Sequence, residues 1–166
     1  MSGIVGAVGA KSGVITRTES QIGRTCLAYL TSGGTFSGET YHTGYTQYMN
    51  DSSGLYSVGT NGITIGISAN YLVDLSLLSE EMASSGWRAL NLAYNGTTLD
   101  GNMYSIQRMD TGGAERLTLK MSSVVPLIAG RAYGIYSRVE TGNHDLSGGS
   151  HLHTHIGITY ISSYIN

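Results

Sequence analysis

Apolar side chains recur at every second position in much of this chain, and that alternation restricts the fold more than any other feature of the sequence. It is clearest at Tyr71, Val73, Leu75 and Leu77, which alternate with a mixed set of residues. A period of two places such a set on one face of a β-strand, whereas an amphipathic helix needs a period near 3.6. Similar stripes, which together predict about eight to ten strands, occur at residues 90–94, 117–121, 133–139 and 151–161.

Turn residues separate these stripes. Asn95-Gly96 directly follows residues 90–94, and Asn-Gly is the strongest hairpin signal because both residues accept the positive φ of a type I′ turn. The chain has 24 Gly and a single Pro, a composition typical of short strands joined by tight turns. Only residues 79–86 could form a helical turn, and we interpret them as a loop. The predicted fold is an all-β, antiparallel jelly-roll sandwich.

Charge is scarce, which excludes several classes of function. Only 12% of the 166 residues are charged and the net charge is −2, whereas a nucleic-acid-binding protein needs a basic face. No apolar run approaches the roughly 20 residues that cross a bilayer. The single cysteine, Cys26, cannot form a disulfide within the chain, and we expect it to be a small buried hydrophobic residue. A surface with so little charge suggests that much of it is hidden against copies of the chain or against partners.

Residues 1–22 form a separate predicted segment. Glycines occupy positions 3, 6, 9 and 13, and the apolar residues around them are Ile4, Val5, Val8, Val14 and Ile15. Three triplets without proline cannot form a collagen helix, and the spacing is not that of a phosphate-binding loop. The start also lacks the features of a signal peptide. We interpret residues 1–22 as an apolar arm that orders on docking to a partner, with a frayed terminus as the alternative, and residues 23–166 as the head domain.

A tyrosine-rich segment spans residues 33–54, and we interpret it as a loop. Tyr41, Tyr45 and Tyr48 lie there among hydroxyl and amide side chains. Such rings could stack on sugars, as a receptor-binding tip requires. Tyrosine also favours protein interfaces, where it offers rigid area with a polar end. Glycan binding and an interface or core position therefore both stay open for this set.

Candidate catalytic residues are isolated in the sequence. Glu80-Glu81 follows a strand and is interpreted as a solvated corner. Asp145 with Asn143 offers too few oxygen atoms for Ca²⁺, which takes about six to eight. The serine-hydrolase and zinc-protease motifs are missing. Three further acidic residues lack a histidine nearby in the sequence, namely Asp100, Asp110 and Glu115. We predict that the chain is not an enzyme.

Several segments follow one another in an order typical of one jelly-roll superfamily. Residues 54–58 and 69–75 look like its glycine-led strand pair, and residues 90–96 like its strand that runs into an Asn-Gly turn. Residues 124–135 look like its L-x-x-G-D-x-V segment, with Arg131 in place of the usual Asp and an unexpected Pro126. Residues 155–161 are similar to its closing F-S-G-Y-L-I strand, with Ile156 in place of the Phe. From residue 26 onward, the chain resembles the complement globular head and tumour necrosis factor superfamily.

Residues 2–15 resemble the opening segment of small virion proteins of aquatic tailed phages, several of which have this kind of jelly roll behind it. The resemblance implies a homotrimer, a place in the virion after assembly in the host cytoplasm, and no enzymatic activity. The expected protein is a tail fibre or tip that docks through its arm and can bind host surface glycans. A capsid decoration (cement) protein is the first alternative, and a free lectin-like or cytokine-like binding module is the second.

Histidine alternates with other residues at His151, His153 and His155, inside the last predicted strand. Alternate residues share a face, so the three imidazoles are expected on the side opposite Ile156 and Ile158. The outer face of this sheet lies near the three-fold axis in the resembled trimers, and two rings of three histidines would suit an octahedral transition metal. The alternative is a set of solvent-exposed or interface histidines at a loop–strand junction.

Overall fold

The structure is a computed structural model that describes residues 22–51, 54–82, 86–109 and 116–163. Over these ranges it contains eleven strands and no helix, so no described segment offers a long apolar helix that could span a membrane. The strands are β1 (Thr25–Leu30), β2 (Gly34–Tyr41), β3 (Tyr45–Asn50), β4 (Tyr56–Gly59), β5 (Gly62–Ile65), β6 (Ala69–Met82), β7 (Gly86–Tyr94), β8 (Thr98–Met109), β9 (Leu117–Leu127), β10 (Ala132–Leu146) and β11 (His155–Ser163).

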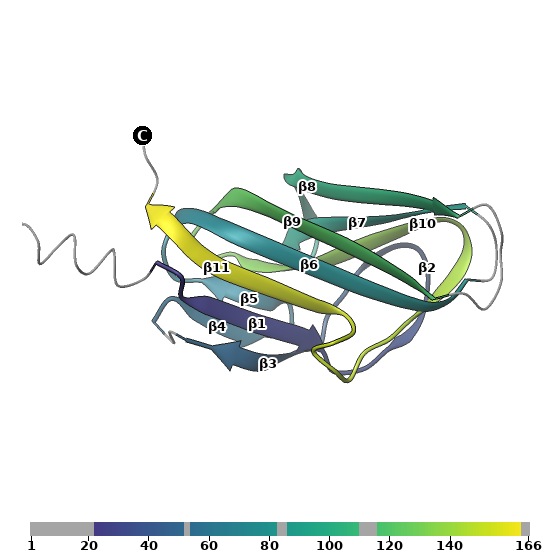
Figure 1. The fold of residues 1–166 in the computed structure, drawn as a ribbon, viewed down its shortest axis with the longest axis horizontal. Coiled ribbons are helices and arrows are strands. Elements are labelled where there is room, and N and C mark those ends of the chain that lie inside the picture. Colours follow the sequence, from purple (N-terminus) through teal and green to yellow (C-terminus); the bar gives the residue numbers. More distant parts are fainter. Residues whose placement is uncertain (1–21, 52–53, 83–85, 110–115, 164–166) are drawn as a thin grey trace, which may run out of the picture.

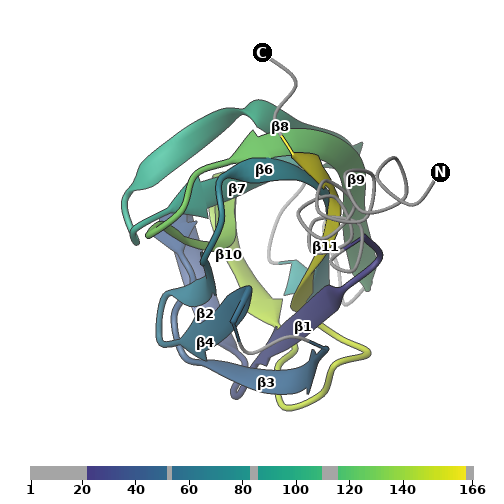
Figure 2. The same cartoon turned by 90° about the vertical axis from the view of Figure 1, so that its left-hand side faces the viewer.

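The strands form two layers that face each other across the core (Figures 1 and 2). The front layer in Figure 1 has the order β3-β1-β11-β6-β9. The rear layer has the order β4-β5-β10-β7-β8, and β2 pairs with β10 beyond the end of β5. Every pairing is antiparallel, and the long strands β6 and β10 also pair at one end, which joins the two layers. This arrangement is a jelly-roll sandwich.

The core confirms the alternation seen in the sequence. Tyr71, Val73, Leu75 and Leu77 of β6 are all at most 2% exposed, and their neighbours in the strand point outward. On β11, Ile156 and Ile158 face the same interior. Each large apolar side chain buried in this way contributes about 1.5–3 kcal/mol. The predicted hairpin is also confirmed, since Asn95 and Gly96 have φ values of 53° and 81° between β7 and β8.

Three local predictions differ from the structure. Residues 79–86 are not simply a loop, because β6 continues to Met82 through pairing with β10, and β7 begins at Gly86. Residues 33–54 are not one loop either, because they contain β2 and β3. Both are edge strands whose side chains are largely exposed, so the hydrophobic alternation that reveals a strand is weak there. The last strand begins only at His155, and residues 151–154 form a turn before it.

The predicted arm lies outside the described residues except for its last position, Ile22, which is 55% exposed. Its five apolar docking candidates, Ile4, Val5, Val8, Val14 and Ile15, are all outside the described ranges. Where the chain enters the head, Gly23 donates its N–H to the carbonyl of Tyr160, at 2.9 Å. The Tyr56 hydroxyl donates to the carbonyl of Arg24, at 2.7 Å. The first described residues are therefore tied to the end of β11 and to β4.

Candidate functional site

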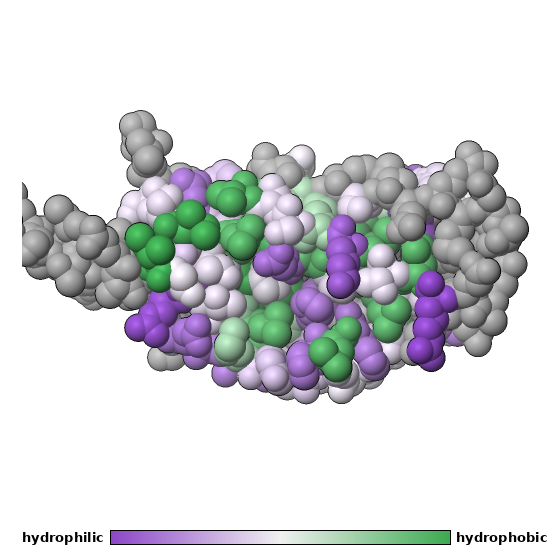
Figure 3. Space-filling model, viewed as in Figure 1, coloured by the Kyte–Doolittle hydropathy of each residue, from purple (hydrophilic) through white to green (hydrophobic). Residues whose placement is uncertain are grey.

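The outward side chains of β1, β11, β6 and β9 form a continuous surface, which we call the front face. The strand register aligns Thr25, Thr159, Leu72 and Val124 in one row across it. Val124 is 56% exposed. Figure 3 shows apolar residues gathered over β11, β6 and β9 toward the end where the chain enters the head. Apolar surface gathered in this way makes the front face the candidate interaction surface of the head.

The next row of the front face is nearly flat at its centre. It contains Leu27, Gly157, Asp74 and Ser122 in register. Gly157 has no side chain and is itself buried, with Leu27 and Asp74 beside it, so no large group stands out from this part of the row. Within residues 25–30, 69–79, 117–127 and 155–163, only two residues have formal charges, Asp74 and Lys120. A partner could therefore cover this face while burying few charges.

The three histidines do not share a strand face. His155 is the first residue of β11 and points to the front face, but His151 and His153 lie in the preceding turn. His153 Nδ1 is 2.8 Å from Ser147 Oγ and 3.1 Å from the carbonyl oxygen of Gly148, so it stabilises that turn. The sequence predicted two rings of three histidines around a three-fold axis. That prediction required all three side chains to share one face of a strand, and they do not.

His155 itself remains a candidate metal ligand. Its Nδ1 is buried without a hydrogen-bond partner in the described part of the chain. Burial lowers the pKa of His155, the nearby Lys120 lowers it further, and Asp74 opposes the shift. Among the described residues, no group of three His, Cys, Asp or Glu in one chain is placed to bind a metal ion. A site built from three chains stays a prediction, which metal analysis of the purified protein would test.

The three tyrosines are separated by the structure. Tyr45 is buried and accepts the Ile135 N–H on its hydroxyl oxygen, at 2.7 Å, so it belongs to the core. Burial raises the pKa of Tyr45. The Tyr41 hydroxyl donates to the carbonyl of Asn61, at 2.8 Å, and burial raises its pKa to about 12. Only Tyr48 is strongly exposed, at 54%.

Tyr48 occupies a bulge that turns it away from its neighbours. In the β1–β3 ladder, Leu27 pairs with Met49 and Ala28 pairs with Gln47, so Tyr48 has no partner. A bulge of this kind redirects one side chain. The Tyr48 ring stacks on His151, with ring centroids 3.8 Å apart and planes 12° apart. Two segments that the sequence presents as separate candidates therefore meet in space.

The remaining sequence candidates have structural roles or lie outside the described residues. Cys26 is fully buried, as predicted, and burial raises the pKa of its thiol to about 12. Asp145 accepts a hydrogen bond from Thr35. The backbone of Glu80 and Glu81 belongs to β6 rather than to a corner. Asp100 is 8% exposed, whereas Asp110 and Glu115 lie in the undescribed part between β8 and β9.

Two buried polar features were missed from the sequence, since single residues give no periodic signal. His42 Nε2 lies 2.7 Å from Ser137 Oγ, and both residues are 1% exposed. Arg88 is also 1% exposed and donates from Nη1 to the carbonyl of Trp87, at 3.1 Å. Burial lowers the pKa of Arg88. The His42–Ser137 pair resembles a catalytic dyad in distance only, because both side chains are sealed in the interior.

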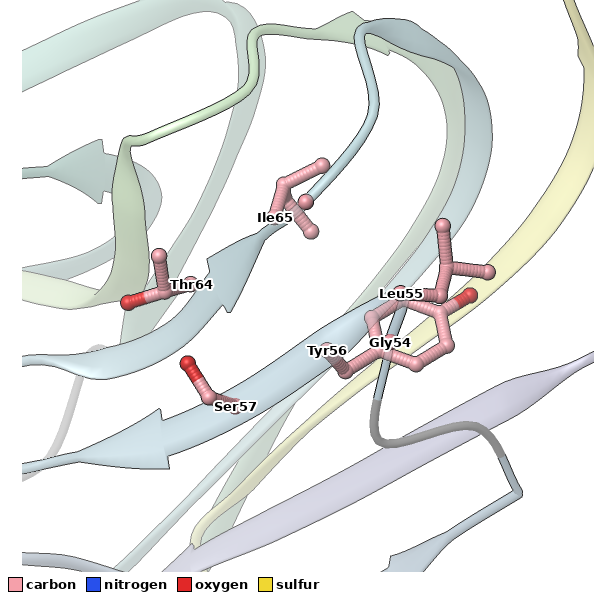
Figure 4. Close-up of a pocket in the computed structure, with 7 residues that line it drawn as sticks. Gly54, Leu55, Tyr56, Ser57, Thr64 and Ile65 are labelled. Carbon is pink, nitrogen blue, oxygen red and sulfur yellow. The ribbon is translucent and has the colours of Figure 1, made fainter.

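A shallow cavity of about 200 Å³ lies at the β4–β5 hairpin (Figure 4). Ser57 and Thr64 contribute hydroxyl groups to it, and Gly54 and Gly66 also line it. The other lining residues are Leu55, Tyr56 and Ile65, of which the tyrosine hydroxyl is already bonded to Arg24. The lining therefore has no carboxylate, imidazole or amine for acid–base chemistry.

The two-layer strand order defines the fold as a jelly roll of the tumour necrosis factor type, as predicted. Eiger TNF from S. frugiperda matches with a TM-score of 0.65 at 10% identity, over 87% of this chain and 96% of that chain. Murine APRIL at pH 5.0 matches with a TM-score of 0.63 at 12% identity, over 84% of this chain and 99% of that chain. No family model and no curated protein matches the sequence. At these identities the likeness shows the fold alone.

Proposed function

We propose that this chain is a non-enzymatic structural protein of a phage virion, a homotrimer that docks through residues 1–22. The observation that favours self-assembly most strongly is the front face, where Leu27, Leu72 and Val124 lie among small residues and only two charges. A stable interface needs a wide, well-packed, largely uncharged surface. The four strands of the front face provide one, and a trimer of such heads would hide it.

The virion role rests on the sequence rather than on the head. Residues 2–15 resemble the opening segment of small phage virion proteins, and their apolar residues suit an extended arm that inserts between partner subunits. A tail fibre or tip would project the head outward from such an anchor. A capsid decoration protein would use the same anchor to bind neighbouring capsid subunits. In both roles the protein is part of the virion and is assembled in the host cytoplasm.

A free binding module is the second candidate, and the fold is compatible with it. Solved structures with the same jelly roll include Eiger TNF and APRIL, at 10% and 12% identity. A free module needs the head and its exposed surfaces but has little use for an apolar arm. The two candidates therefore differ in what residues 1–22 do.

Light scattering on the full-length chain tests the assembly. A homotrimer would have three times the 17.6 kDa mass of one chain. A monomer at micromolar concentration would refute the proposed use of the front face.

Deletion of residues 1–22 tests the arm. The truncated protein should remain trimeric but should no longer be incorporated into particles when it is supplied in place of the full chain. Incorporation at the normal copy number would refute the docking role, and a reconstruction of the particle would then locate the true contact.

A further inference from the structure

Tyr48 and His151 form a preorganised aromatic surface on the outside of the head. They come from distant parts of the chain, one from the bulge in β3 and the other from the turn before β11. Their rings are nearly parallel, with centroids 3.8 Å apart. Because each ring fixes the orientation of the other, a ligand that stacks on Tyr48 would have to immobilise little more of the side chain.

The polar atoms of this pair are available to a ligand. Within the described part of the chain, neither the Tyr48 hydroxyl nor the ring nitrogens of His151 form a hydrogen bond. The contrast is clear with Tyr41 and Tyr45, whose hydroxyls are bonded to the backbone at 2.8 Å and 2.7 Å. The pair therefore offers an open ring surface together with donors and acceptors at its edges.

The two segments that carry the pair are uncharged and partly apolar. Residues 46–50 and 147–155 contain no Asp, Glu, Lys or Arg. Leu152, next to His151, is 74% exposed, and Met49, next to Tyr48, is 38% exposed. A ligand matched to this surface has an apolar face for the ring and hydroxyl groups for the polar edge, and it needs no charge. A sugar ring has this chemistry.

We propose that the Tyr48–His151 pair binds a neutral oligosaccharide by stacking of one sugar ring on Tyr48. The inference deepens the proposed virion role by naming the ligand class, and it would place one such site on each head of the trimer. It also restricts the glycan prediction made from the sequence to Tyr48, and adds His151, which the sequence suggested only as a metal ligand.

A glycan array with neutral and anionic oligosaccharides, probed with the labelled full-length protein, provides the first test. We expect binding to neutral glycans. Tyr48→Ala should weaken the affinity for the best of them by about tenfold or more, because the stacking surface is lost. His151→Ala should weaken it less, and Tyr48→Phe should retain most of it. Leu99→Ala is the matched control, because Leu99 is exposed, at 44%, on another part of the head.

Several results would overturn the proposal. They are no binding to any neutral glycan, binding to anionic glycans alone, or unchanged affinity in both alanine variants. Light scattering on the same samples separates this outcome from failure of the proposed function. A trimer that binds no glycan contradicts only the sugar site, whereas a monomer that binds glycans through Tyr48 contradicts only the assembly.

Discussion

The two outer surfaces of the sandwich cover the same core but are built differently. On the front face, the outward rows contain threonine, serine, glycine and aliphatic residues, with Asp74 and Lys120 as the two charged residues of the ranges defined above. The outward side chains of β2, β7, β8 and β10, which we call the rear face, include Glu39, Arg138, Trp87 and Leu99. Arg138 Nε lies 3.3 Å from Glu39 Oε1, and its guanidinium lies 5.1 Å from the centre of the Trp87 ring.

This difference indicates that the rear face is the surface suited to solvent exposure. On the rear face, charged groups have partners within the same chain. Glu140, for example, accepts a hydrogen bond from the backbone N–H of Trp87, at 3.1 Å. Such a surface is complete in a single molecule. The front face has an exposed aliphatic side chain, Val124, and few charges, which is why the proposed assembly covers it with another copy of the chain. The shortage of charged residues in this chain is therefore most marked on the front face.

The largest expected effect comes from adding a charge to each face in turn. Val124→Arg should convert the proposed trimer to a monomer, because an unpaired charge would be buried at the proposed interface. Leu99→Arg is the matched control on β8, where the starting side chain is similarly exposed, at 44% against 56%. Light scattering measures both masses. If Leu99→Arg dissociates the protein and Val124→Arg does not, the roles of the two faces are reversed.

The next largest expected effect is a loss of stability at high pH, to which both layers contribute. Cys26 lies under the front layer and Tyr41 lies in the rear layer, and burial raises both pKa values to about 12 from ordinary values of 9.0 and 10.0. The unfolded chain therefore loses these protons first as pH rises, so stability should fall progressively between about pH 9 and pH 12. Chemical denaturation across this range measures the loss. Cys26→Ala should make it shallower, and an unchanged curve would contradict the contribution of the thiol.

Two glycines in central strands provide a smaller and more local test. A Cβ at Gly134 would lie 2.7 Å from Tyr41 Oη and 2.8 Å from the Asn61 carbonyl oxygen, whereas at Gly157 the nearest atom would be Leu27 Cδ1, at 3.5 Å. Gly134→Ala should therefore destabilise the fold by about 1–3 kcal/mol. Gly157→Ala should fold normally and weaken only the proposed trimer. Thermal unfolding and light scattering together distinguish the two, and equal melting temperatures would contradict the crowding at Gly134.

The fold could largely be predicted from the sequence because burial imposes a period of two. The stripe from Tyr71 to Leu77 and the Asn95-Gly96 turn are both confirmed. The edge strands β2 and β3 were missed, because side chains of both lie largely in solvent and no alternation is required of them. The end of β6 was missed because pairing with β10, rather than an apolar pattern, extends it.

The candidate site was less predictable, since it depends on register. Tyr48 and His151 could each be selected by residue type, but their contact follows from a bulge opposite Leu27 and Ala28 and from a turn that ends at residue 154. Neither has a local sequence signal. The histidine alternation suggested a strand that begins four residues too early, which placed His151 and His153 on the wrong element. For Tyr45 the sequence left glycan binding and an interface or core position both open, because an edge strand was interpreted as a loop; the structure places it in the core.

The smallest effect should come from the ion pair of the rear face. Glu39 and Arg138 are 59% and 50% exposed, so Glu39→Gln should lower the free energy of unfolding by less than about 1 kcal/mol, and by less still in high salt. Arg138→Lys keeps the charge but loses the flat guanidinium over Trp87. It should therefore change tryptophan fluorescence more than stability. Neither variant should alter the mass of the assembly, because this surface is satisfied within one chain. If Glu39→Gln dissociated the proposed trimer, the rear face would be an interface. The proposed difference in role between the front and rear faces would then be wrong.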